Sequence, residues 1–277
     1  MYFDLFKIKG ILEQTYDIPF ITKLITSDKN NEKIIVFPDN EFNELFEIYA
    51  EIKNGIRVIL EVLPQKFAAD FPKLLQNSRP EQKLLFTEFG KNLEDRGVSC
   101  KLLINEQLYP VTDSKNWPHD WTKFSLRITK SPLISEDDLT PLNEKLSEYI
   151  ELCIGMILSL LDIIPLEDKI HYEGKKNEIT TNRYERNPLN RKLCLLKNGY
   201  TCKICGFNFE KVYGNIGRGF IHVHHIVPVS LMGGEYIINP ETDLIPLCPN
   251  CHAMIHKQNP PFSPDELRKI IDNNKSK

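Results

Sequence analysis

Apolar and β-branched residues cluster in short stretches of the first half of the chain, and Pro, Asn and Asp residues separate these stretches. This pattern is typical of β-strands. The predicted strands are residues 33–37, 56–63, 98–104 and 124–128.

Two helices are predicted among and after these strands. Ser78 and Pro80 are typical of a helix start, with Ser78 as the cap, and Leu and Phe residues follow at helical spacing until Gly97 ends the helix. The second helix is predicted from about Asp138 to Leu161. Strands interrupted by helices indicate one α+β domain over residues 1–165.

Residues 166–182 are polar and show no periodicity, which indicates a linker between domains. Residues 183–277 are then predicted to form a second domain. It begins with a short helix that Pro188 opens and that Gly199 ends.

A length of 277 residues, with 41% apolar and 26% charged residues, fits a soluble protein of two globular domains. The first residues carry charges inside any apolar stretch, so no signal peptide is predicted and we expect a cytoplasmic protein. The longest apolar run, residues 152–161, is too short to span a membrane. We interpret it as a buried helix, or as a helix whose residues 154–161 form a homodimer surface.

Four of the seven cysteines form two Cys-x2-Cys pairs: Cys202 with Cys205, and Cys248 with Cys251. Each two-residue spacer lets a tight turn present two sulfurs to one ion, so the four thiolates predict a closed, structural zinc site. A zinc ribbon that binds DNA or protein without catalysis is the alternative. The three other cysteines are predicted to be buried thiols: Cys100, Cys153 and Cys194.

Five of the seven histidines lie in the same region, and four sulfurs already fill a tetrahedral zinc, so the histidines indicate a second, open metal site. His252 and His256 are four residues apart, so on a helix they share one face. His224 can supply a third nitrogen, while its neighbour His225, on a strand, faces the other way. His222 is interpreted as a partly buried structural histidine or as a further metal ligand.

The C-terminal third resembles HNH nucleases of the ββα-metal class with zinc knuckles, and in particular restriction endonucleases of the McrA type, which cut DNA carrying modified cytosine. The matching residues are Val223 to Ile226 with Pro228, Gly233-Gly234, and Asp243 to His256. The resemblance implies a ββα arrangement, with a first strand over residues 220–227, Gly233-Gly234 in a loop, a second strand from Asp243 to Leu247, and a helix that begins near Pro249. The resemblance implies a metal-dependent endonuclease that hydrolyses phosphodiester bonds in double-stranded DNA, as a defence against phage and other foreign DNA. No family is recognised in the first 165 residues.

The resemblance also implies a role for each residue of the site. His225 is the general base that takes a proton from the attacking water, and His224, His252 and His256 hold the catalytic metal ion. The products would carry a 5′ phosphate and a 3′ hydroxyl. Asp243 stands where the family expects an asparagine that braces the loop orienting the base. Asn250 is the other candidate for that asparagine, although its place in the knuckle is typical of a turn residue.

Three neutral imidazoles are softer ligands than the oxygens that Mg²⁺ favours. We therefore expect Mn²⁺, Co²⁺ or Ni²⁺ to support cutting better than Mg²⁺.

From Arg183 onward the chain holds 13 Lys and Arg residues against 8 Asp and Glu residues, a net charge of +5, whereas the preceding segment has a net charge of −8. Phosphate affinity is therefore expected mainly in the C-terminal part. The predicted DNA-binding residues are Arg183, Arg186, Arg191, Lys192 and Lys197. A solvated helix face is the alternative interpretation of these charges.

A ββα unit contacts mostly the DNA backbone, so the first domain is expected to choose which DNA is cut. Trp117 and Trp121, with Tyr109 upstream, are interpreted as stacking faces for a flipped, modified cytosine, or else as core residues. The acidity of this domain also fits binding of a partner protein or a phage product. For the whole chain, the alternatives are a zinc-dependent DNA-binding regulator without catalysis, and a nuclease toxin or homing-type endonuclease.

Overall fold

A computed structural model describes residues 2–27, 31–39, 45–54, 56–66, 68–133, 141–161, 187–226, 238–258 and 260–275. The chain divides into two compact units, residues 1–171 and 172–277. The predicted linker, residues 166–182, lies outside the described residues. No helix in the described ranges is long and apolar enough to cross a membrane.

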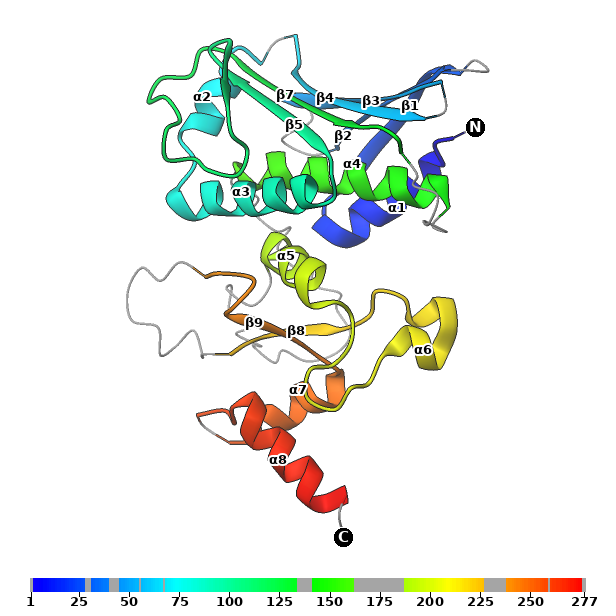
Figure 1. The fold of residues 1–277 in the computed structure, drawn as a ribbon, viewed down its shortest axis with the longest axis vertical. Helices are drawn as coiled ribbons and strands as arrows, with labels where there is room; N and C mark the ends of the chain where they lie inside the picture. Colours follow the sequence, from blue (N-terminus) through cyan, green and yellow to red (C-terminus); the bar gives the residue numbers. More distant parts are fainter. Residues whose placement is uncertain are drawn as a thin grey trace, which may run out of the picture. The chain divides into compact units, whose positions relative to one another are not determined.

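Unit 1 is built on a seven-stranded antiparallel sheet with the strand order β1-β2-β3-β4-β7-β5-β6 (Figure 1). The strands are β1 (Phe20–Ser27), β2 (Asn31–Pro38), β3 (Phe46–Lys53), β4 (Arg57–Pro64), β5 (Ser99–Ile104), β6 (Gln107–Tyr109) and β7 (Phe124–Lys130). Buried positions alternate with half-buried ones along β2, which indicates that one face of the sheet packs against a core.

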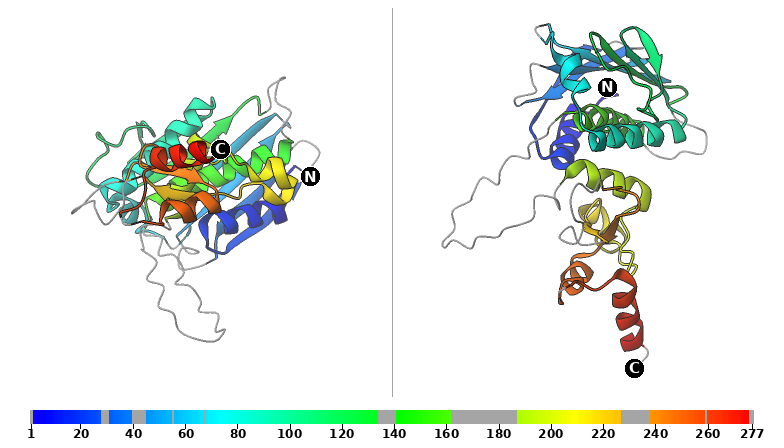
Figure 2. Two further views of the ribbon diagram at one scale, coloured as in Figure 1. Left: turned by 90° about the horizontal axis from the view of Figure 1, so that it is seen from below. Right: turned by 90° about the vertical axis from the view of Figure 1, so that its left-hand side faces the viewer.

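Four helices accompany the sheet in the described part of unit 1: α1 (Leu5–Tyr16), α2 (Phe71–Gln76), α3 (Pro80–Asp95) and α4 (Leu142–Ser159). Helices α1, α3 and α4 cover the same face of the sheet, as the right-hand view of Figure 2 shows. The core of unit 1 lies between this helical layer and the sheet, in the arrangement of a two-layer α+β fold.

Two details of the predicted helices were wrong. Helix α3 begins at Pro80, as predicted, but the cap position is Arg79, whose backbone N–H donates to the Gln82 side chain at 2.7 Å, while the Ser78 hydroxyl donates to the Leu75 carbonyl at 2.7 Å. The second detail is the homodimer surface predicted for residues 154–161. The apolar side chains from Ile154 to Leu161 are at most 6% exposed within one chain, so they do not form a surface for a second copy. The alternative of a buried helix is therefore correct.

Of the three cysteines predicted to be buried thiols, Cys153 and Cys194 are buried and Cys100 is half-buried. Burial raises the pKa of the Cys100 thiol to about 12 and that of the Cys194 thiol to about 11. Both thiols therefore stay protonated at neutral pH.

Unit 2 is smaller and contains a two-stranded sheet surrounded by short helices. Its elements are α5 (Pro188–Asn198), α6 (Phe209–Tyr213), the 3₁₀ helix η1 (Gly214–Gly217), β8 (His222–His225), β9 (Leu244–Leu247), α7 (Pro249–Ile255) and α8 (Pro264–Lys275). Helix α5 has the predicted bounds, with the Asn187 side chain accepting from the N–H groups of its first turn and Gly199 at a positive φ at its end. The core of this unit includes three of the four paired cysteines.

Candidate active site

The short hairpin of β8 and β9 and the helix that follows it carry the histidines of the candidate site and two of the four paired cysteines. The strands pair antiparallel, with His224 opposite Ile245 and His225 opposite Leu244. Cys248 joins β9 to α7 and caps this helix, because its sulfur accepts from the Cys251 N–H at 3.4 Å. Pro249 occupies the first turn of α7, where its missing N–H costs no hydrogen bond.

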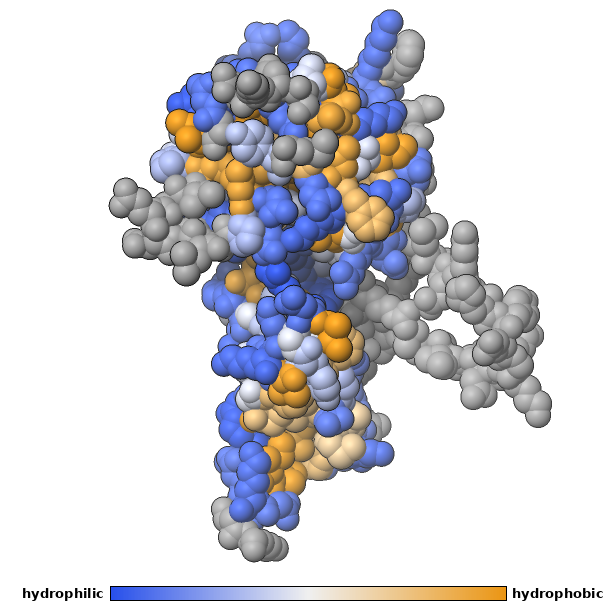
Figure 3. All heavy atoms as spheres, turned by 90° about the vertical axis from the view of Figure 1, so that its right-hand side faces the viewer, coloured by the Kyte–Doolittle hydropathy of each residue, from blue (hydrophilic) through white to orange (hydrophobic). Residues whose placement is uncertain are grey.

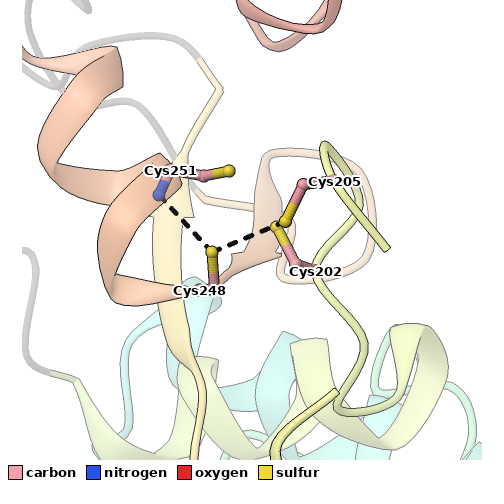
Figure 4. Close-up of side chains that lie close together, drawn as sticks. All are labelled: Cys202, Cys205, Cys248 and Cys251. Atoms are coloured by element: carbon pink, nitrogen blue, oxygen red, sulfur yellow. Dashed lines mark hydrogen bonds between the residues drawn. The ribbon is translucent and has the colours of Figure 1, made fainter. Parts of the chain in front are cut away.

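The four paired cysteines come together in one cluster, and their sulfurs all lie within 4.8 Å of one another. Figure 4 shows the loop of Cys202 and Cys205 facing the start of α7, which carries Cys248 and Cys251. A backbone hydrogen bond of 3.0 Å from the Lys203 N–H to the Pro246 carbonyl holds this loop against β9.

The geometry of the cluster fits a zinc ion. The sulfurs of Cys205 and Cys248 are 3.7 Å apart, which is close to the edge of about 3.8 Å expected for a tetrahedron with Zn–S bonds of about 2.3 Å. Burial raises the pKa of the Cys202 thiol, but backbone hydrogen bonds from Cys205, Cys248 and Ile204 outweigh it and lower the pKa to about 7. At least one thiolate is therefore readily formed.

A second cluster consists of His224, His252 and His256, whose ligand nitrogens also lie within 4.8 Å of one another. The ring of His224 is 5.3 Å from the ring of His252 and 4.8 Å from that of His256, measured between centroids. The rings of His252 and His256 are 5.0 Å apart, as expected for residues one helical turn apart.

This histidine cluster fits a divalent metal ion as well. The Nδ1 atom of His224 is buried and has no hydrogen-bond partner among the described residues. Burial, together with the positive charges that His256, His252 and His225 carry when protonated, lowers the pKa of His224 to about 3. The imidazole is therefore neutral at pH 7, and the neutral form is the one that binds a metal.

His222 differs from its prediction. Its side chain is exposed rather than partly buried, and it is not part of the three-histidine cluster. Its ring still lies 5.2 Å from that of His252, because alternate residues of β8 share a face. His222 therefore borders the cluster on its solvent side.

His225 occupies the last position of β8. Because successive residues of a strand point to opposite faces, His225 lies on the opposite face of β8 from His224. Its side chain is only 6% exposed.

Asp243 precedes β9 and organises the turn beside His225. One carboxylate oxygen accepts from the Asn239 N–H at 2.7 Å, and the other accepts from the Thr242 hydroxyl at 3.0 Å. The Asp243 carbonyl also accepts from the N–H of Ile226, the residue after His225, at 2.8 Å. Sequence reasoning missed Asn239 and Thr242, although Asn239-Pro240 is a typical turn signal. Asn250 lies exposed in the first turn of α7.

The predicted DNA-binding residues are only partly available at the surface. Arg183 and Arg186 lie outside the described residues. Lys192 is buried, which is contrary to prediction, and Lys197 pairs with Glu241. Arg191 is half-buried, its Nη1 atom has no hydrogen-bond partner among the described residues, and desolvation lowers its pKa. The basic stretch is therefore not a simple exposed face.

The aromatic residues of unit 1 do not form the predicted stacking site. Trp117 and Trp121 are buried, and their rings are 5.6 Å apart within a cluster that also contains Phe86 and Phe124. Tyr109 is half-buried, and its hydroxyl donates to the Gln107 side chain at 3.1 Å. The tryptophans pack as core residues, so neither presents an open face to a DNA base.

Comparison with known proteins identifies the region that carries both clusters. Residues 202–258 match the sequence model of the family described as HNH endonuclease. This region is an HNH domain. The type IV methyl-directed restriction enzyme EcoKMcrA of Escherichia coli (strain K12) is 32% identical over 88 residues, which are 30% of this chain and 30% of that enzyme. No solved structure matches the chain significantly.

These comparisons confirm the resemblance to HNH proteins of the McrA type for the C-terminal region of the chain. They also confirm the mixed α+β class with a cysteine-bearing HNH domain at the C-terminal end. The chain spans about 30% of the length of the curated relative that it matches. The family match therefore lies within unit 2.

Proposed function

We propose that this protein is a metal-dependent endonuclease that hydrolyses phosphodiester bonds in double-stranded DNA as part of a restriction system. The observation that carries the proposal is the convergence of His224, His252 and His256 within an HNH domain. His225 is the next residue after His224 in the sequence. A zinc ribbon without catalysis would need the four cysteines alone. It would not account for a second, separate cluster of three histidines.

The proposed roles follow from this arrangement. His224, His252 and His256 would hold a divalent ion, and the ion would supply positive charge to the scissile phosphate and to the departing oxygen. His225 would accept the proton of the water that attacks phosphorus. Asp243 would hold the turn that follows His225 through its contacts with Asn239, Thr242 and Ile226. The products would be a 5′ phosphate and a 3′ hydroxyl.

Supercoiled plasmid incubated with the full chain tests this proposal. We expect nicking with Mn²⁺, Co²⁺ or Ni²⁺, weaker nicking with Mg²⁺, and a loss of about 100-fold or more in His225→Ala, because general-base catalysis typically contributes 10²–10⁴-fold. Metal content should be unchanged in His225→Ala. The matched control is His119→Ala, which removes an exposed histidine of unit 1 and should leave nicking intact.

Two results would contradict the endonuclease assignment. If the wild-type chain leaves the plasmid intact with every divalent metal but still binds DNA, the protein is a DNA-binding regulator. If His225→Ala nicks as fast as the wild type, the chemistry lies elsewhere in the molecule.

We further propose that the restricted DNA carries modified cytosine. The support is the likeness to an enzyme whose name describes it as methyl-directed. Digestion of matched plasmids containing cytosine, 5-methylcytosine or 5-hydroxymethylcytosine tests this. We expect at least one modified plasmid to be cut faster than the bare one. Equal cutting of all three would refute modification dependence while leaving the nuclease proposal intact.

A further inference from the structure

Unit 2 carries an exposed apolar projection immediately before β8. We call residues 209–220, which comprise α6, η1 and the residues up to Phe220, the arm. Ile216 is 88% exposed and Phe220 is 48% exposed, and Val212 and Tyr213 are also more than half exposed. Figure 3 views the side of the molecule on which α6 lies and shows apolar side chains gathered among hydrophilic ones on this unit. Apolar side chains clustered on a surface commonly mark an interaction site.

Local contacts hold the arm together and leave Ile216 exposed. The Asn208 side chain caps α6 by accepting from the Lys211 N–H at 2.9 Å. A Cβ on Gly217 would lie 2.3 Å from the Phe209 carbonyl oxygen, so η1 can approach α6 this closely only with glycine at this position. The Phe209 ring packs against the core of unit 2 and lies 4.7 Å from the Phe220 ring.

The arm is continuous with the histidine cluster. The Phe220 ring lies 6.0 Å from the His222 ring, and the His222 ring lies 5.2 Å from that of His252. A phosphate bound at the histidine cluster would therefore have its adjoining nucleotides close to Phe220. The arm also carries the exposed cations Lys211 and Arg218, and Arg218 pairs with the single acidic residue, Glu210, at 3.9 Å. The arm therefore has a net charge of +1, which complements the charge of DNA.

We propose that the arm docks on the DNA beside the cleaved bond, with Ile216 wedged against a base step that it unstacks. Branched and aromatic side chains that enter DNA in this way separate neighbouring bases and bend the duplex. The inference rests on the proposed function, because it takes DNA as the molecule bound at the histidine cluster. The arm would then fix the distance between the distorted step and the bond that is cut.

The test uses the full chain carrying His225→Ala, so that DNA is bound but not cut. After the nick made by the wild type has been mapped, 2-aminopurine is placed at the steps flanking it, and its fluorescence reports unstacking. We expect fluorescence to rise on binding, and Ile216→Ala to abolish the rise and weaken DNA binding about tenfold. The slope of affinity against salt concentration should not change, because an apolar contact releases no counterions.

Two variants serve as controls. Ile216→Leu retains an apolar wedge and should keep most of the fluorescence rise. Ile270→Ala makes the same chemical change at an exposed position on α8 and should bind and unstack DNA as the parent does.

The outcomes separate this inference from the proposed function. Unchanged affinity and fluorescence in Ile216→Ala, with wild-type nicking intact, would overturn the arm's role while leaving the nuclease standing. Sedimentation that shows a dimer of the free protein dissociating in Ile216→Ala would identify the arm as a self-association surface instead. A wild-type chain that neither nicks nor binds DNA would overturn both proposals.

Discussion

Gly155 lies in the C-terminal part of α4, where this helix meets α1 and α3. A Cβ at this position would be 2.6 Å from the hydroxyl oxygen of Tyr16 and 2.7 Å from the ring of Phe89. The Tyr16 hydroxyl also donates to the Glu151 carbonyl at 2.6 Å, so it cannot move away without losing that bond. We therefore expect Gly155→Ala to lower the free energy of unfolding of unit 1 by about 1–3 kcal/mol, measured by urea denaturation.

Gly10 offers the matched control for this substitution. It is a glycine inside α1, and a Cβ there would meet no atom within 4 Å. Gly10→Ala should raise the free energy of unfolding by about 0.5–1 kcal/mol, because alanine restricts the unfolded chain and favours the helix. Equal effects of the two substitutions would show that α4 is not packed as described.

Asp243 provides a second prediction for a single residue, which rests on the proposed function. Asp243→Ala removes both carboxylate acceptors of the turn, whereas Asp243→Asn retains one oxygen that can accept from the Asn239 N–H. We expect the alanine variant to nick plasmid about 10–100-fold more slowly, as is typical when a supporting hydrogen bond is lost, and the asparagine variant to lose less. Metal content, measured in parallel, should not change. A loss of bound metal in Asp243→Ala would contradict the positioning role.

The sequence alone predicted the pairs within both clusters because the spacing inside each pair is local. Two cysteines separated by two residues, or two histidines one helical turn apart, must face the same ion wherever the helix or turn lies. Joining the two cysteine pairs, and joining His224 to His252 and His256, also required zinc chemistry and the resemblance to HNH nucleases, since these residues are distant in sequence. The exposure of His222 and the burial of Lys192 were not predictable in this way. They depend on which segments pack over β8 and α5, and no short pattern in the sequence encodes that packing. The same holds for Trp117 and Trp121, whose ring contacts come from two separate elements, α3 and β7.

At the scale of whole elements, the strands recognised from the sequence correspond to β2, β4, β5 and β7, each within a few residues of its predicted bounds. In unit 1, strands β1, β3 and β6 and helices α1 and α2 were missed. The β1 sequence Phe20–Ser27 places Thr and Lys residues among the apolar ones, and its exposed half carries no clear alternation. It forms a strand because it pairs with β2 along its length, which is a tertiary effect.

The zinc site joins two elements that are distant in sequence. The loop of Cys202 and Cys205 precedes β8, whereas Cys248 and Cys251 start α7. The sulfur cluster joins these two ends, beside the backbone hydrogen bond from Lys203 to Pro246. We expect Cys205→Ser to reduce the zinc bound per chain by one equivalent, measured by atomic absorption, and to lower the melting temperature of unit 2. Cys100→Ser, which alters a half-buried thiol of unit 1, should retain all the zinc. Retention of zinc in Cys205→Ser would show that Cys205 is not a ligand.

At the scale of the whole molecule, the two units differ in what holds them together. Unit 1 has an extensive core between its sheet and its helices, and none of the metal-binding clusters found among the described residues lies in it. The core cluster of unit 2 has nine buried residues, and three of them are the cysteines Cys202, Cys248 and Cys251. A core of this size rarely folds without a metal or another cross-link.

Removal of metal should therefore act on one unit alone. We expect calorimetry of the full chain to show two unfolding transitions, and a strong chelator such as EDTA to lower the midpoint of only one of them. The transition that the chelator lowers should belong to unit 2, and Gly155→Ala should lower the midpoint of the other transition, which belongs to unit 1. Restoring zinc should recover the midpoint of unit 2, because a ligand that binds only the folded state stabilises that state by mass action. A single transition that shifts as a whole with chelator would mean that the units unfold together and that the metal supports the entire chain.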